Sequence, residues 1–139
     1  GLPPDRLGER IAVMAEFLGL SRLLDSVTGS LPRGRQQRLS LACANLHEPS
    51  ILFLDEPTGS VDPVSRRDFW DLIHTLAHGG ATVFVTTHHM DEAEYCRRVS
   101  VMVDGRIAAL DTPAELKNRF APGGTLQDAF VALVEKGIA

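Results

Sequence analysis

The chain has 139 residues, 44% of them apolar, which is enough for one domain with a buried core. Its formal net charge is -4 and its pI about 5.7, which excludes the broad positive field typical of nucleic-acid-binding proteins. It shows no signal peptide and no span-length apolar stretch, and Cys43 and Cys96 are expected to be reduced thiols of a cytosolic protein.

Two helices are predicted before the first strand. The first opens at two prolines, repeats apolar residues at helical spacing and closes near Gly19. A break rich in Gly, Pro and Arg follows at residues 28–38. Residues 39–47 (LSLACANLH) are predicted to form the second helix, ended by Pro49.

A parallel crossover unit is predicted next. Residues 51–54 (ILFL) and 82–87 (TVFVTT) are short apolar runs, typical of strands buried on both faces. Between them, residues 63–80 are helical, with proline at the start and glycines at the end. A strand, a helix and a strand in that order predict two parallel neighbours in one sheet.

The last third predicts a hairpin and two helices. Residues 99–103 and 106–110 flank Asp104-Gly105, a two-residue turn signal. Residues 112–120 begin with a threonine cap and a proline, and residues 125–137 are an amphipathic helix. The fold class predicted from this order is α/β, with helix-rich material ahead of the sheet.

Two adjacent acids, Asp55 and Glu56, stand where the first strand ends, and His88 follows the second strand. Ligands of open parallel sheets bind at the carboxyl ends of the strands. One acid would hold a divalent cation and the other would take a proton from, or orient, an attacking water. Spacing alone leaves open a helix-capping turn with solvated acids.

Three segments resemble motifs of the ATP-binding-cassette (ABC) ATPases. Residues 51–63, ILFLDEPTGSVDP, resemble the Walker B strand and the D-loop that follows it. Residues 31–44, LPRGRQQRLSLACA, resemble the family's signature motif, ordinarily LSGGQ-x-QR. Residues 83–116, VFVTTHHMDEAEYCRRVSVMVDGRIAALDTPAEL, resemble the switch-histidine segment and the hairpin after it. The order of the three motifs matches that of the family. The residues around them are most similar to those of the drug-export type of ABC transporter ATPase.

The resemblance implies a fold and its division. It implies part of a P-loop NTPase core, with a parallel sheet and flanking helices. Part of the ABC helical subdomain and a C-terminal hairpin and helices are implied as well. Residues 1–48 would belong to the helical subdomain, with the signature and its helix. Residues 49–139 would be the C-terminal part of the nucleotide-binding core.

The resemblance also implies cofactors and site residues. Asp55 would bind Mg²⁺, Glu56 would be the general base for ATP hydrolysis, and His88 would hydrogen-bond the γ-phosphate and the water. The further residues implied to contact ATP or cross to a partner subunit are Leu31, Arg33, Gly34, Arg35, Gly59, Ser60, Val61 and Asp62. A metal site at His88 and His89 is not expected, because residues 91–95 are typical of an exposed helix start.

The implied function is the ATP-binding and ATP-hydrolysing subunit of an exporter. Its partners would be transmembrane permease subunits and a second ATPase domain in a head-to-tail dimer, on the cytoplasmic face of the cell membrane. Two alternatives are a soluble cassette ATPase acting on nucleic acid or ribosomes, and a non-catalytic regulatory module. The acidic balance argues against nucleic acid as a partner.

Two departures from the family pattern qualify this function. The sequence holds no P-loop, G-x-x-x-x-G-K-[ST], so we expect a C-terminal fragment with little ATP affinity of its own. Such a fragment should expose an edge and a face of its sheet and self-associate. In the signature, Pro32 replaces a serine; Arg33 and Arg35 would either contact phosphate or be solvated or face acidic partner surface.

Overall fold

The computed structural model describes residues 3–59 and 61–135. The chain divides into two compact units, Gly1–Thr86 and Thr87–Ala139, which are treated separately below. No helix in the described ranges combines the length and apolar character needed to cross a membrane.

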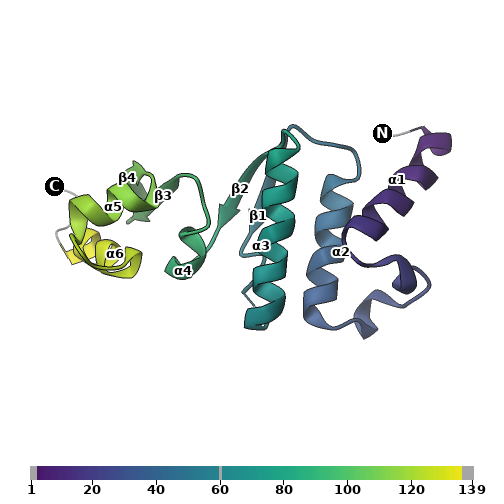
Figure 1. Cartoon of the computed structure of the whole chain (residues 1–139), viewed down its shortest axis with the longest axis horizontal. Coiled ribbons are helices and arrows are strands. Elements are labelled where there is room, and N and C mark those ends of the chain that lie inside the picture. Colours follow the sequence, from purple (N-terminus) through teal and green to yellow (C-terminus); the bar gives the residue numbers. More distant parts are fainter. Residues whose placement is uncertain (1–2, 60, 136–139) are drawn as a thin grey trace. The chain divides into compact units, whose positions relative to one another are not determined.

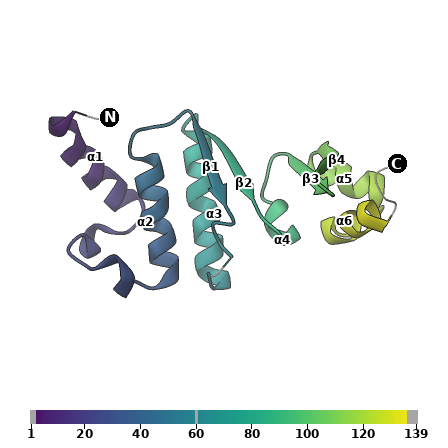
Figure 2. The same cartoon turned by 180° about the vertical axis from the view of Figure 1, so that it is seen from behind.

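The first unit is a two-stranded sheet with three helices (Figures 1 and 2). Its elements are α1 (Pro4–Phe17), α2 (Arg33–Asn45), β1 (Ile51–Asp55), α3 (Pro63–His78) and β2 (Thr82–Thr86), with short 3₁₀ turns at Ser21–Leu23 and Thr28–Ser30. The strands β1 and β2 are parallel, in a register that pairs Ile51 with Thr82 and Asp55 with Thr86. The predicted crossover unit is therefore confirmed.

The core of the first unit lies around α3. Phe69 and Trp70 are each 2% exposed, and Ile73 follows them on the same helix. Figure 2 shows the two strands side by side with α3 against one face of their sheet. Buried residues of the other elements complete the core: Met14, Ala15, Leu18, Leu20, Leu41, Ala42, Leu52 and Val61.

The opposite face of the β1–β2 sheet is open, so the prediction of strands buried on both faces is wrong. Leu52 is 4% exposed, whereas Phe53 is 75% and Phe84 is 58% exposed, and the two phenyl rings stack at 5.4 Å. Side chains alternate between faces along a strand, and α3 packs against one face only. The exposed sheet face expected of the chain is confirmed.

The helix α2 begins at Arg33, six residues earlier than predicted. Pro32 has an extended backbone (φ -55°, ψ 149°) and takes the N-cap position, where its carbonyl accepts N–H groups of Arg35 and Gln36 at 2.9 and 3.0 Å. Arginine and glutamine are good helix formers, so the helix begins directly after Pro32 although Gly34 is a poor one. The signature segment therefore opens the helix instead of preceding it.

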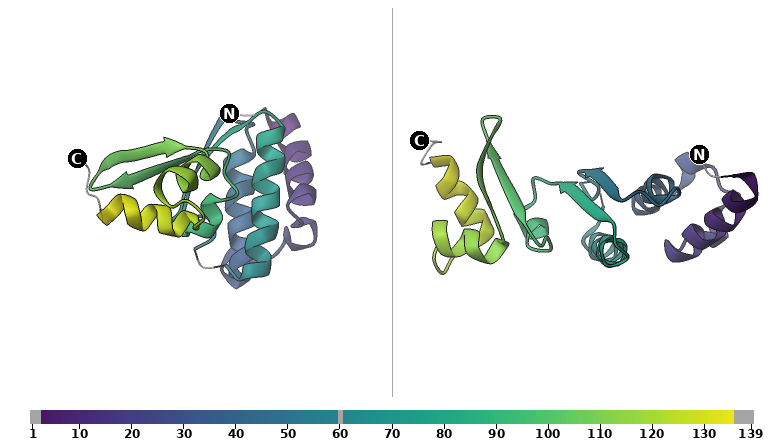
Figure 3. Two further views of the ribbon diagram at one scale, coloured as in Figure 1. Left: turned by 60° about the vertical axis from the view of Figure 1, so that its left-hand side comes forward. Right: turned by 90° about the horizontal axis from the view of Figure 1, so that it is seen from above.

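The second unit is a hairpin covered by helices (Figure 3). Its elements are α4 (Met90–Ala93), β3 (Val99–Val103), β4 (Arg106–Asp111), α5 (Pro113–Phe120) and α6 (Leu126–Glu135). Asp104 (φ 48°) and Gly105 (φ 74°) form the predicted turn, in the left-handed conformation that joins twisted strands. Thr112 caps α5 by accepting the Glu115 N–H at 3.2 Å, also as predicted.

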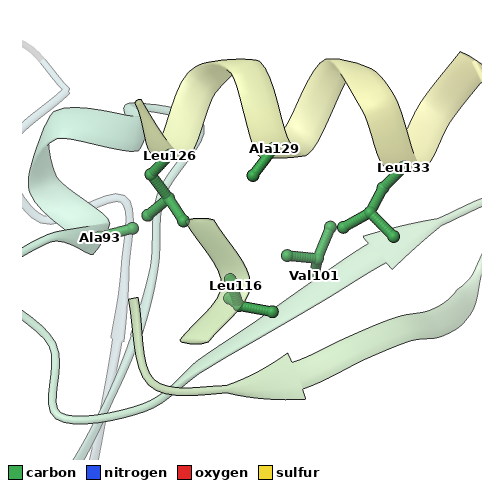
Figure 4. Close-up of a cluster of buried hydrophobic side chains, with 6 residues drawn as sticks. All are labelled: Ala93, Val101, Leu116, Leu126, Ala129 and Leu133. Atoms are coloured by element: carbon green, nitrogen blue, oxygen red, sulfur yellow. The ribbon is translucent and has the colours of Figure 1, made fainter. Parts of the chain in front are cut away.

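One hydrophobic cluster holds the second unit together (Figure 4). Leu126, Ala129 and Leu133 of α6 face Val101 of β3 and Leu116 of α5. The spacing of three and four residues on α6 is the amphipathic pattern expected from the sequence. The predicted end of this helix, at residues 136 and 137, lies outside the described residues.

Candidate functional site

The carboxyl ends of β1 and β2 bring Asp55 beside Thr86. The two residues are register partners in the parallel ladder. Because alternate residues share a face, Asp55 lies on the open face with Phe53, and Thr86 lies there with Phe84. The Asp55 carboxylate is exposed, as a ligand-binding group at a strand end must be.

Hydrogen bonds connect Thr86 to both acidic residues. The Thr86 hydroxyl donates to Oδ1 of Asp55. The Glu56 N–H donates both to that hydroxyl and to the Thr86 carbonyl, each at 3.1 Å. Among the described residues, Asp55 makes no ion pair, so no internal arginine neutralises it.

Glu56 turns the chain away from the strand. Its φ of 41° lies in the left-handed region, which costs a residue with a β-carbon about 1–2 kcal/mol. The turn that follows is held by the Gly59 N–H donating to the Glu56 carbonyl at 3.2 Å, and Thr58 is 1% exposed. Adjacent acids therefore do not continue the strand alternation, as expected from the proline at position 57.

The donor set at this strand end fits Mg²⁺ bound together with phosphates. Magnesium is usually held by one or two carboxylates, with waters and substrate phosphates filling the other positions. Asp55 supplies one such exposed carboxylate. No group of three or more His, Cys, Asp or Glu side chains in the described ranges forms a complete metal cage. Asp55 therefore fits the single carboxylate ligand that such a cation needs.

The signature and D-loop residues line one concave region of about 590 Å³ in the first unit. Gly34 near the start of α2 lies against Val61 and Ser65 near the start of α3. Three of the predicted site residues, Arg33, Gly34 and Arg35, line this region together with two others, Val61 and Asp62. Leu31 precedes it and Gly59 is in the turn after Glu56; Ser60 lies outside the described residues.

The side chain of Asp62 caps α3. It accepts the Ser65 N–H at 3.0 Å, and this backbone hydrogen bond, followed by one to the Ser65 side chain, holds the pKa of Asp62 below its ordinary value. A charged cap at a helix start also interacts favourably with the helix dipole. Asp62 thus has a structural role, in addition to any contact with a partner.

The arginines of this concave region differ in their contacts. Arg35 donates to the Gly19 carbonyl at 2.9 Å, and Arg38 donates to the Leu18 carbonyl at 3.4 Å. Both contacts tie α2 to the end of α1. Within the described ranges, the exposed Arg33 guanidinium makes no hydrogen bond or ion pair, so it is the arginine available to a ligand or a partner.

In the second unit, the segment after β2 holds His88. This histidine is exposed, and its ring lies 4.0 Å from that of His89. Thr87 beside it accepts the His89 N–H and donates to the Glu92 carboxylate, both at 3.0 Å. Because His88 and the Asp55–Glu56 pair belong to different units, their meeting in one site stays a prediction.

Glu92 is fully buried, so the prediction of an exposed helix start over residues 91–95 is wrong at this position. The Glu92 carboxylate accepts a hydrogen bond from Thr87, and Ala93 beside it is part of the buried hydrophobic cluster. These two contacts place one side of α4 in the interior of the second unit. Burial first, and then the Glu92 charge, raise the pKa of the Cys96 thiol. Cys43 and Cys96 are both free thiols, as predicted.

The contacts of Thr86, Thr87 and Glu92 are not predicted from the sequence. The sequence predicts the first two residues only as the end of a strand. The available signal was a pair of hydroxyl residues directly before a predicted catalytic histidine, at the strand edge where ligands bind. Their partners depend on the strand register and on packing, which single residues do not reveal.

Comparisons with known proteins identify the family that this chain resembles. The family described as ABC transporter matches residues 6–59. The chain is 46% identical, over 96% of its length, to a probable multidrug ABC transporter ATP-binding protein, YbhF, of Escherichia coli, covering 24% of that protein. It is also 46% identical, over 72% of its length, to a fluoroquinolones export ATP-binding protein of Mycobacterium tuberculosis, covering 34% of it.

A solved structure gives the same result. The chain matches cbiO1 of Clostridium perfringens, described as part of the ABC transporter complex cbiONQ, with a TM-score of 0.76 and 30% identity. The match covers 86% of this chain and 48% of that one. The chain thus spans less than half the length of each of these three proteins. The α/β cassette fold predicted for it is confirmed. This chain belongs to the ABC transporter family.

Proposed function

We propose that this chain supplies the Walker B, signature and switch-histidine residues of an ATPase subunit that drives an exporter. The observation that supports this most directly is the end of β1, where Asp55 is exposed, unpaired by arginine in the described ranges, and followed by Glu56 in a turn. Relatives named for multidrug transport and fluoroquinolone export support the direction of transport.

The two acids have separate roles in this proposal. Asp55 holds Mg²⁺, which when bound neutralises charge on the phosphates. Glu56 accepts a proton from the attacking water as general base, and the exposed imidazole of His88 hydrogen-bonds the γ-phosphate and that water. Phosphoryl transfer depends mainly on positioning and charge neutralisation, which suits a site with a rigid strand end.

The signature residues would bind the nucleotide held by a second ATPase domain. Gly34 lies in the first turn of α2, where backbone N–H groups of a helix start favour an anion. Arg33 projects without an internal partner among the described residues and would add a charge-assisted bond to phosphate. Leu31, Arg35 and the D-loop over residues 59–62 would complete this face of a head-to-tail dimer.

The domain division and the partners belong to the same proposal. Residues 1–48 would form part of the helical subdomain and residues 49–139 part of the nucleotide-binding core. Transmembrane permease subunits would carry the substrate, and the ATPase would bind them at the cytoplasmic face of the membrane. The relative described as part of a transporter complex, cbiO1, supports such an assembly.

The test is Glu56→Gln in the complete protein that carries this chain together with a P-loop. Loss of a general base should lower ATP turnover on the order of 10²-fold or more, while ATP binding stays largely intact. The matched control is Glu16→Gln, an exposed glutamate on α1, which should leave turnover unchanged. Turnover at the wild-type rate in Glu56→Gln would remove Glu56 from its proposed role.

A further inference from the structure

Thr86 lies in the segment that resembles the switch-histidine motif, but the resemblance assigns it no role. It is the last residue of β2 and the register partner of Asp55, on the open face of the sheet. Its side chain is exposed, so burial does not explain the presence of a threonine there. What distinguishes it from the other threonine on that face, Thr82, is its contact with both acidic residues.

The hydroxyl of Thr86 donates a hydrogen bond to one acidic residue and accepts one from the backbone of the next. A hydroxyl has one proton to donate and two lone pairs that accept. The proton goes to Oδ1 of Asp55, and a lone pair receives the Glu56 N–H at 3.1 Å. A hydroxyl held from both sides in this way has a fixed orientation, and a bond to a carboxylate is stronger than one between neutral groups.

This arrangement constrains both acids at once. Rotation of the Asp55 carboxylate would break the bond at Oδ1, so this bond holds the carboxylate in one orientation. The Glu56 N–H is held by the hydroxyl and carbonyl of Thr86 while the backbone adopts its left-handed φ of 41°. Such a conformation persists only where neighbouring groups enforce it.

We propose that Thr86 is a positioning residue, which orients the Asp55 carboxylate toward Mg²⁺ and fixes the start of the Glu56 turn. The inference rests on the proposed metal role of Asp55. Carboxylates that ligate metals are themselves hydrogen-bonded, and loss of such an outer partner typically lowers metal affinity or activity by roughly 10–100-fold.

The experiment compares Thr86→Val, Thr86→Ser and Thr82→Val in the complete protein. Valine keeps the branched shape and removes the hydroxyl, serine restores the hydroxyl, and Thr82 is exposed on the same face and strand without contacting Asp55. Mn²⁺ binding in the presence of a non-hydrolysable ATP analogue is measured by electron paramagnetic resonance, alongside kcat, KM and thermal unfolding.

In Thr86→Val, Mn²⁺ affinity and kcat should each fall roughly 10–100-fold. The KM for ATP and the unfolding temperature should change little. Thr86→Ser should recover most of both losses, and Thr82→Val should behave as wild type. Wild-type Mn²⁺ affinity in Thr86→Val would overturn the inference, whether or not its unfolding temperature falls.

A fourth variant, Asp55→Asn, separates this inference from the proposed function. If Asp55→Asn binds Mn²⁺ as tightly as wild type, the proposed metal role of Asp55 is wrong. If Asp55→Asn loses Mn²⁺ but Thr86→Val does not, the metal role stands and the positioning role of Thr86 is wrong.

Discussion

Gly34 packs against Ser65 at the start of α3. A β-carbon added at position 34 would stand 3.4 Å from the Ser65 β-carbon and 3.6 Å from Cγ1 of Val61. These are ordinary van der Waals distances, so the packing of α2 on α3 leaves room for a methyl group. A requirement for glycine at this position must therefore come from something other than the described neighbours.

We predict that Gly34→Ala folds as well as the original chain, whereas Gly34→Leu does not. Alanine in a helix is favoured over glycine by up to about 1 kcal/mol, while an overpacked leucine typically costs about 1–3 kcal/mol. Urea unfolding followed by the fluorescence of Trp70, the single tryptophan, measures both effects. A large loss of stability in Gly34→Ala would show that the contact with Ser65 is tighter than described.

The same alanine variant tests the signature in the complete protein. If Gly34 allows the close approach of a phosphate, Gly34→Ala should lower ATP turnover although the fold is retained. Unchanged turnover would show that the glycine is not needed for nucleotide contact.

The cap at Asp62 should make the stability of the chain depend on pH. Hydrogen bonds from Ser65 hold the pKa of Asp62 below its ordinary value in the folded state. Its contribution is therefore fully present above the unfolded-state pKa of roughly 4, and it is lost as pH falls through the lower folded value. Asp62→Asn keeps a capping oxygen but removes this pH dependence.

Thermal unfolding of wild type and Asp62→Asn between about pH 6 and pH 2 checks this prediction. The difference in unfolding temperature between the two proteins should change as the pH falls below about 4. Asp128 has a pKa lowered in the same way by Thr125, so its contribution is common to both proteins. The control is Asp25→Asn, an exposed aspartate outside the helix starts. Parallel pH curves for wild type and Asp62→Asn would contradict the prediction.

Local patterns in the sequence were sufficient to predict most of the elements. The crossover strands, the hairpin at Asp104-Gly105 and the cap at Thr112 each depend on a few adjacent residues with strong backbone preferences. The sequence does not predict the start of α2, because the stretch of Gly, Pro and Arg is typical of a single break, whereas the helix begins directly after Pro32.

Packing could not be predicted in the same way. The apolar run of β1 gave no sign that Phe53 would be exposed, because burial depends on what covers each face of the sheet. The acidic segment after His88 is typical of an exposed helix start, yet Glu92 is fully buried and accepts a hydrogen bond from Thr87. The bonds of Thr86 follow from the strand register, a property of two segments together.

The open face of the β1–β2 sheet should drive self-association of this chain. Phe53 and Phe84 are 75% and 58% exposed and stack on each other, so they form one apolar surface at the centre of the sheet face. Burying a phenylalanine side chain contributes roughly 1.5–3 kcal/mol, enough to change an association constant on the order of tenfold or more. Phe53→Thr keeps a residue suited to strands and removes most of this surface.

Light scattering over a range of concentrations should show wild type associating and Phe53→Thr shifting toward monomer. Val64→Thr is the matched control, because Val64 is 74% exposed on α3, outside the sheet face. A uniform monomer of the wild-type chain at high concentration would contradict the prediction. An equal shift in Val64→Thr would show that general surface hydrophobicity, and not the stacked pair, drives association. Only a selective effect of Phe53→Thr identifies the open sheet face as the contact surface, because the two variants remove apolar side chains of comparable exposure.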